Sequence, residues 1–101
     1  MKQMVSYTLT PDRVAENKRL VEAVFTALRE ARPSGLRYAT FRLPDGVSFV
    51  HIVAHAQGDG SNALTSLPAF KAFAAGVRDR CVAAPVRVGL TEIGSHGVFG
   101  E

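Results

Sequence analysis

The sequence predicts one α+β domain of 101 residues, in which an antiparallel sheet packs against two helices. Two long segments repeat apolar residues every three or four positions, which is helical spacing. The shorter segments around them are rich in β-branched and aromatic residues, which favours strands. A chain of this length is typical of a single domain, so we expect residues 1–101 to share one core.

The N-terminal part of the chain predicts a strand followed by a long helix. Residues 3–9 alternate apolar and polar side chains, as a strand does. The segment TPD at 10–12 then supplies an N-cap hydroxyl, a proline at the first helical position and an acid in the first turn. Apolar residues recur at helical spacing until Pro33 and Gly35, which predict the end of the helix.

The middle of the chain predicts a β-hairpin. Residues 36–43 and 47–56 flank the segment PDG at 44–46, and Asp-Gly between two strand-like segments is a strong hairpin signal. A turn centred there pairs Thr40 with His51, which fixes the faces of the hairpin.

The two predicted faces of the hairpin differ in character. One is cleanly apolar, and we expect the helices to cover it; its residues are Ala39, Phe41, Val50, Ile52 and Ala54. The other is mixed; its residues are Tyr38, Thr40, Arg42, Phe49, His51, Val53 and His55. We expect the mixed face to lie against something less apolar than a helix.

The C-terminal part predicts a second helix and a last strand. Residues 64–81 carry an apolar stripe at helical spacing, with a break expected near Pro68. Residues 84–93 read as a strand. The order β-α-β-β-α-β is the split βαβ arrangement of ferredoxin-like folds, with an antiparallel sheet.

Charge and cysteine content narrow the class of protein. The net charge is +3, but basic and acidic residues are interleaved, so neither nucleic acid nor a membrane surface is an expected partner. No apolar segment approaches the roughly 20 residues that span a bilayer. Cys81 is the only cysteine, which fits a reducing compartment. With no signal peptide in the first residues, we expect a cytoplasmic protein.

His51 and His55 raise the question of a metal site. On a strand, residues four apart are separated by about 13 Å, whereas zinc–nitrogen bonds are about 2 Å long. One ion therefore cannot bind both side chains if the hairpin prediction holds. His96 has no cysteine or carboxylate at ligand spacing. We expect no metal site.

His51 is the candidate catalytic residue, because it lies in mid-strand on the mixed face. It would act as a general base or as a polar anchor; the alternative is a hydrogen-bonded histidine with a structural role. The expected ligand-pocket residues are Tyr38, Thr40, Phe49, Val53 and Arg87. Cys81 ends an apolar stripe and is expected to be a small buried residue rather than a nucleophile.

Residues 45–52, DGVSFVHI, partly match the RNA-recognition motif, which shares this element order. Asp45 replaces the expected cation and Val47 replaces a stacking aromatic, so RNA binding is a distant third possibility.

The chain resembles the dimeric α/β-barrel proteins, the group that includes antibiotic biosynthesis monooxygenases. The resemblance spans nearly the whole chain and is strongest at SNALTSLPAFKAF, residues 61–73, which looks like the two-part second helix of that family. It implies a homodimer in which the mixed faces of two sheets meet and close a barrel. Many catalytic members of that family carry a tryptophan near the start of the second helix, but this chain has no tryptophan. Thr65, Pro68 and Ala69 stand where haem-degrading members often place histidines. Haem degradation is therefore disfavoured.

Two functional classes follow. One is a monooxygenase-like enzyme without a cofactor that acts on a small aromatic or quinone-like compound, with His51 as base and Tyr38 or Arg87 holding an oxyanion. The other is a non-catalytic dimer that binds a small apolar ligand or has a structural role.

Overall fold

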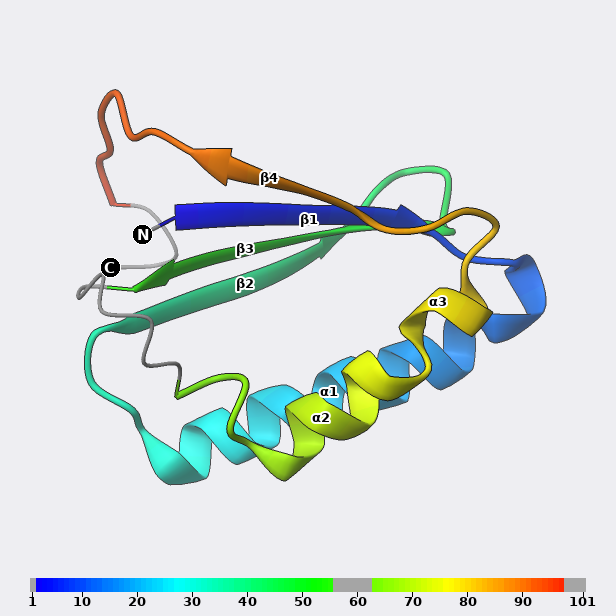
Figure 1. The fold of residues 1–101 in the computed structure, drawn as a ribbon, viewed down its shortest axis with the longest axis horizontal. Coiled ribbons are helices and arrows are strands. Elements are labelled where there is room, and N and C mark those ends of the chain that lie inside the picture. The colour runs from blue at the N-terminus through cyan, green and yellow to red at the C-terminus, as the bar shows by residue number, and fades with distance from the viewer. Residues whose placement is uncertain (1, 56–62, 98–101) are drawn as a thin grey trace.

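The structure, a computed structural model, describes residues 2–55 and 63–97, which form a sheet with helices on one face (Figure 1). The strands are β1 (Lys2–Thr8), β2 (Leu36–Arg42), β3 (Ser48–His55) and β4 (Val86–Leu90). The helices are η1 (Pro11–Arg13), a single 3-10 turn, then α1 (Val14–Ala31), α2 (Pro68–Ala75) and α3 (Val77–Arg80). The predicted ferredoxin-like α+β class and element order are confirmed.

The sheet has the strand order β2-β3-β1-β4, and every neighbouring pair is antiparallel. Thr40 lies opposite His51, so the predicted hairpin register is confirmed. In the turn, Gly46 has φ +79°, a conformation that side chains rarely adopt. The Asp45 carboxylate accepts hydrogen bonds from the Ser48 hydroxyl and from the backbone N–H groups of Ser48 and Val47, which lower its pKa and hold the turn.

The end of α1 and both ends of α2 lie at or near proline or glycine residues. After α1, Arg32 takes a left-handed conformation, with φ 46°, and its N–H donates to Leu28 O. The second helical segment begins at Pro68, where a break was predicted, but residues 64–67, predicted to belong to the same helix, form turns and a bend instead. The helix is broken again at Gly76, which was not predicted. A Cβ at Gly76 would lie 3.0 Å from a guanidinium nitrogen of Arg80, so a side chain there would crowd that arginine.

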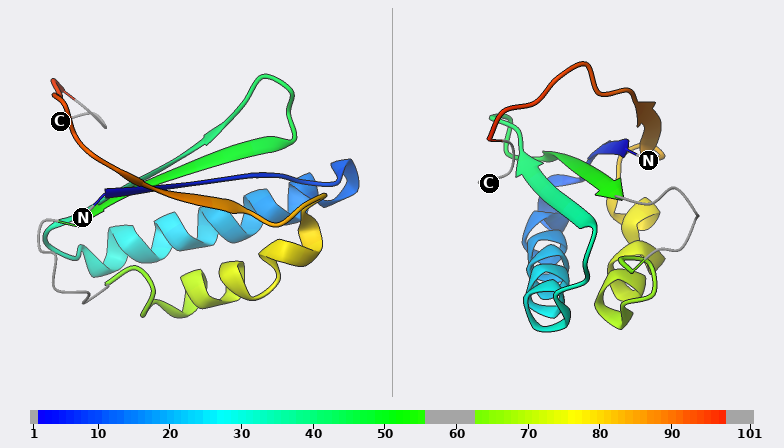
Figure 2. Two further views of the ribbon diagram at one scale, coloured as in Figure 1. Left: turned by 45° about the horizontal axis from the view of Figure 1, so that its top comes forward. Right: turned by 90° about the vertical axis from the view of Figure 1, so that its left-hand side faces the viewer.

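The helices cover the mixed face of the hairpin, so the prediction that they cover the apolar face was wrong. Phe49 and His51 are buried with Tyr7 beneath α1 and α2, and Tyr38 and Val53 pack against the same core. The two helices run side by side under this face, while no helix of residues 2–55 or 63–97 lies on the other face (Figure 2).

The open face is the apolar one. Phe41, predicted to be covered, is 49% exposed, and β4 adds Val86, Val88 and Leu90 to the same exposed surface. Alternation along a strand shows which residues share a face, but it does not show which face the connecting helices cross. The covered face tolerates its polar side chains because they hydrogen-bond to one another.

Candidate functional site

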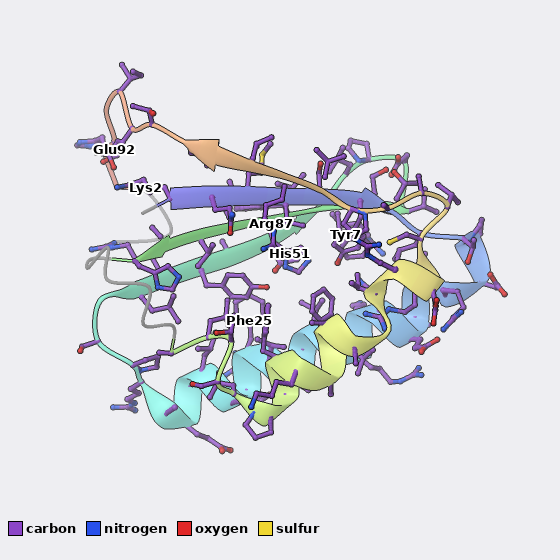
Figure 3. The ribbon with its side chains drawn as sticks, viewed as in Figure 1. Lys2, Tyr7, Phe25, His51, Arg87 and Glu92 are labelled. Carbon is purple, nitrogen blue, oxygen red and sulfur yellow. The ribbon has the colours of Figure 1, made fainter. Side chains whose placement is uncertain are left out.

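A cavity of about 580 Å³ lies between the covered face of the sheet and α2. Its walls are largely apolar and include Val5, Val53, Phe70 and Phe73. In Figure 3, the side chains of Tyr7 and His51 point from the sheet toward the helices. The volume falls in the range of small-molecule sites, roughly 300–1,000 Å³.

Four of the six residues predicted from the sequence line this cavity, namely Tyr38, His51, Val53 and Arg87. Phe49 is buried in the core, where its ring stacks on Tyr7 with centroids 5.8 Å apart. Thr40 is not among the lining residues, but its hydroxyl lies 3.1 Å from His51 Nδ1. Phe49 and Thr40 therefore contact residues of the site without lining the cavity.

A series of buried, hydrogen-bonded polar side chains connects Arg80 to His51. Arg80 Nε donates to Asn17 Oδ1 at 3.0 Å, and Asn17 Nδ2 donates to Tyr7 Oη at 3.0 Å. Tyr7 Oη lies 2.7 Å from His51 Nε2. Asn17 and Arg80 are 0% and 2% exposed, so the protein replaces water as their partner.

Arg80 is held without a close carboxylate in the described ranges. Its Nη2 donates to Phe73 O at 2.8 Å, and its guanidinium carbon lies 5.3 Å from the centre of the Phe73 ring. The ion pairs among the described residues involve other side chains. The charge is therefore stabilised by carbonyl oxygens and a π-face.

The sequence pattern around Asn17 and Arg80 indicates buried polar groups, although these two residues were not predicted to belong to the site. Asn17 is three residues after Val14 and four before Val21, so it lies in the apolar stripe of α1. Arg80 follows Val77 by three residues, at similar spacing. A polar residue in such a stripe indicates a buried polar partner, because its desolvation must be compensated.

Both ring nitrogens of His51 contact hydroxyl groups. Nε2 faces Tyr7, while Nδ1 lies 2.5 Å from Tyr38 Oη and 3.1 Å from Thr40 Oγ1. Burial lowers the pKa of His51 to about 4, so the ring is neutral near pH 7. Burial also raises the pKa of Tyr38 to about 12, with a smaller opposing effect from its hydrogen bond to Thr40, so it remains a phenol.

Two exposed arginines complete the cavity lining, Arg78 from α3 and Arg87 from β4. Within the part of the chain that the structure describes, neither lies within 4.0 Å of a carboxylate. The cavity thus combines apolar walls with a hydroxyl–imidazole cluster and two cationic side chains. This combination suits a flat apolar molecule that carries an oxygen anion or a carbonyl.

The other candidate groups do not add to this chemistry. Among residues 2–55 and 63–97, no three His, Cys, Asp or Glu side chains gather as metal ligands would. Burial raises the pKa of the Cys81 thiol, which disfavours the thiolate that a nucleophile requires. No helix in these ranges has the length and apolar character needed to cross a bilayer.

His51 gives the protein a predictable response to acid. Its pKa falls from 6.5 in an exposed chain to about 4 in the fold, so folding favours the neutral ring. The resulting stability is complete above pH 6.5 and is lost as the pH falls toward 4, by roughly 3 kcal/mol in total. Urea unfolding followed by circular dichroism should show this loss, and His51→Gln should reduce it. Equal slopes for both proteins between pH 6.5 and 4.5 would contradict this assignment.

Solved structures share this fold at low sequence identity. Rv0793 from Mycobacterium tuberculosis matches with a TM-score of 0.76 and 17% identity, over 93% of this chain and 95% of that chain. An antibiotic biosynthesis monooxygenase matches with a TM-score of 0.72 and 12% identity, over 92% of this chain and 98% of that chain. SnoaB, a cofactor-independent oxygenase from Streptomyces nogalater, matches with a TM-score of 0.68 and 19% identity, over 93% of both chains.

Comparison at the level of sequence gives no such match. No protein-family model and no curated protein matches the chain. The structural matches cover nearly all of each chain, so the shared element order is not confined to one motif. The chain therefore has the ferredoxin-like α+β fold of the antibiotic biosynthesis monooxygenase structures, which is the resemblance that its sequence suggested.

Proposed function

We propose that the cavity binds a small aromatic or quinone-like molecule bearing an oxygen anion or carbonyl, and that the protein acts on it as a monooxygenase-like enzyme without a cofactor. The observation that carries this proposal is the composition of the cavity. Its walls are largely apolar, and its polar groups include the Tyr38–His51 pair and the arginines Arg78 and Arg87. The fold shared with a cofactor-independent oxygenase supports the reaction class.

The reaction would draw its electrons from the substrate. For a simple probe such as 1-naphthol, the phenol and O2 give 1,4-naphthoquinone and water. One oxygen atom enters the ring, the other leaves as water, and all the electrons come from the phenol. Ionisation of the phenol makes the ring electron-rich enough to react. Arg87 and Tyr38 would favour this ionised form by pairing with its oxygen.

The alternative function is non-catalytic binding of a small ligand. It is favoured by one observation, that both nitrogens of His51 already contact hydroxyl groups of the protein. A histidine held in this way stabilises the pocket even if no reaction takes place. Binding without turnover is the outcome that separates this alternative from the enzyme.

We propose further that the protein is a homodimer, formed through the open face of the sheet. The sequence-based expectation of a dimer stands, but the face assigned to it changes, because α1 and α2 cover the mixed face. Phe41, Val86 and Val88 are the exposed apolar side chains that a second copy would cover.

The function is tested by incubating the purified protein with 1-naphthol in air. We expect uptake of O2 and formation of 1,4-naphthoquinone faster than in buffer, with neither under argon. 2-Naphthoate serves as a non-reacting ligand in calorimetry. Binding of 2-naphthoate without oxidation of 1-naphthol would favour the binding protein. Failure of both probes would contradict the proposed site.

The arginines predict a preference for anionic ligands. 2-Naphthoate should bind more tightly than its neutral isostere 2-naphthamide, because Arg78 and Arg87 line the cavity with no carboxylate partner among the described residues. Each substitution, Arg78→Gln or Arg87→Gln, should weaken 2-naphthoate by about 3- to 10-fold and leave 2-naphthamide nearly unchanged, as expected for solvent-screened pairs. Titration calorimetry at two salt concentrations provides the measurement.

Arg42→Gln is the matched control for these variants. Arg42 is also an exposed arginine on the sheet, but it does not line the cavity. We expect it to change neither affinity. Equal binding of the two ligands by the unmodified protein would refute the preference for anions.

A further inference from the structure

We infer that Tyr7, Asn17 and Arg80 are positioning residues that hold His51 with its proton on Nδ1, so that Tyr38, and not His51, is the group that donates to a bound ligand. The role of Tyr38 as donor to a ligand rests on the proposed function, whereas the position of the proton on His51 does not. The inference follows from the directions in which the buried groups can donate.

Arg80 fixes the direction of the first hydrogen bond, which joins it to Asn17. A guanidinium only donates, so the Asn17 atom 3.0 Å from Arg80 Nε must be the amide oxygen. The amide nitrogen of Asn17 therefore faces Tyr7, and it donates to Tyr7 Oη at 3.0 Å. Asn17 is fully buried, so no water competes for either end of its amide.

Tyr7 fixes the direction of the hydrogen bond between its hydroxyl group and His51. Its hydroxyl oxygen already accepts from Asn17, and its single proton needs an acceptor. Among the described residues, His51 Nε2 is the partner in place for it, at 2.7 Å. If Nε2 carried the proton instead, both groups would present a proton to the Tyr7 oxygen, and the buried Tyr7 proton would be left unpaired. Burial of an unpaired donor is unfavourable.

The third direction follows for Tyr38. A neutral His51 with an unprotonated Nε2 has its proton on Nδ1, which then donates to Tyr38 Oη at 2.5 Å, with Thr40 Oγ1 further away at 3.1 Å. The Tyr38 oxygen thus accepts from Nδ1. Burial raises the Tyr38 pKa and the hydrogen bond with Thr40 opposes that rise, as a bond donated by the Thr40 hydroxyl to the same oxygen does, so the Tyr38 proton is left for the cavity that it lines. Stacking on Phe25, with centroids 5.2 Å apart, holds the Tyr38 ring in place.

The four bonds run in one direction, from the permanent cation of Arg80 to the hydroxyl of Tyr38. Each donor in such a series is made stronger by the bond that its own oxygen or nitrogen accepts. His51 cannot take a proton from a ligand at Nδ1, because that nitrogen is already protonated. The site therefore selects a ligand that arrives as a phenolate or a quinone, rather than one that His51 must deprotonate.

The proton's position on His51 is measured by long-range proton–nitrogen NMR on protein labelled with ¹⁵N-histidine. His55 and His96 serve as internal references, and His51→Gln assigns the signals. We expect the His51 spectrum of a ring protonated at Nδ1 and unprotonated at Nε2. A ring protonated at Nε2 would overturn the inference and restore His51 as a base.

Two tyrosine variants separate the steps. Tyr7→Phe removes the hydroxyl that donates to Nε2, so the Nε2-protonated form should appear in the spectrum. Tyr38→Phe should leave the proton on Nδ1, because Thr40 remains as an acceptor. An unchanged spectrum in Tyr7→Phe would mean that Tyr7 does not position the ring.

Ligand binding tests the role of Tyr38. Tyr38→Phe should weaken 2-naphthoate by about 10-fold, the usual scale of one hydrogen bond to a charged group. Thr26→Ala, on the exposed surface of α1, should not change the affinity. If 2-naphthoate binds the unmodified protein and Tyr38→Phe equally well, Tyr38 is not the donor. If it binds neither, the proposed function fails, while the NMR result still decides the position of the proton.

Discussion

Substitution of Asn17 by leucine is expected to lower the free energy of unfolding by about 3–5 kcal/mol, the usual cost of removing one partner from a buried charge. Arg80 is 2% exposed, and its Nε would lose its acceptor while the charge remained buried. Tyr7 would lose the donor to its hydroxyl oxygen at the same time. For a domain of this size, the melting temperature should fall by more than 10 °C, at roughly 4–8 °C per kcal/mol.

Thermal and urea unfolding followed by circular dichroism provide the measurement. Thr26→Ala is the control on the same helix, because Thr26 is exposed and its hydroxyl bonds only to nearby groups. Its effect should stay within about 0.5 kcal/mol, as is usual for surface positions. A loss below about 1 kcal/mol for Asn17→Leu would show that Arg80 finds another partner.

A double substitution sharpens this test. Asn17→Leu combined with Arg80→Met replaces both polar partners with apolar side chains of similar size. Such replacements are often neutral or stabilising, whereas removal of one partner is not. The double variant should therefore be more stable than Asn17→Leu alone. If it is less stable, the cost of Asn17→Leu does not come from the buried charge.

Val88→Asp is expected to convert the proposed dimer into monomers at micromolar concentration. Val88 lies on β4 and belongs to the apolar surface that the helices leave open, together with Phe41, which is 49% exposed, and Val86, which is 58% exposed. A stable interface buries about 1,200–2,000 Å², with a largely apolar centre. An aspartate within that apolar surface would be an unpaired charge, which strongly opposes association.

Light scattering after size-exclusion chromatography measures the assembly. Ala72→Asp is the matched control, because Ala72 is exposed on α2, on the opposite side of the sheet from Val88. It should leave the dimer intact. A monomeric unmodified protein under these conditions would refute the dimer, and a dimeric Val88→Asp variant would place the interface elsewhere.

Local sequence determined the elements and their order. The Asp45-Gly46 turn set the register that places Thr40 opposite His51, because both strands alternate with a period of two. Pro33 and Gly35 mark the end of α1, and Pro68 begins α2, because proline and glycine restrict or release the backbone locally. These features depend on neighbouring residues, so they can be read without knowledge of the rest of the chain.

The sequence also grouped the residues that share a face. Tyr38, His51 and Val53 were placed together on one side of the hairpin, and they do line one cavity. Arg87 was a separate candidate, and β4 brings it to the same cavity because Arg87 pairs with Val5 on β1.

Only the tertiary structure decided which face the helices cover and what His51 contacts. Hydrophobicity favoured the apolar face of the hairpin, yet the helices cover the mixed one, where polar side chains satisfy one another. Tyr7, Asn17 and Arg80 come from three different elements, β1, α1 and α3, and Arg80 is 63 positions from its partner Asn17. The residue types show which side chains can form hydrogen bonds. Which of these side chains pair is decided by packing, which brings Asn17 within 3.0 Å of both Arg80 and Tyr7.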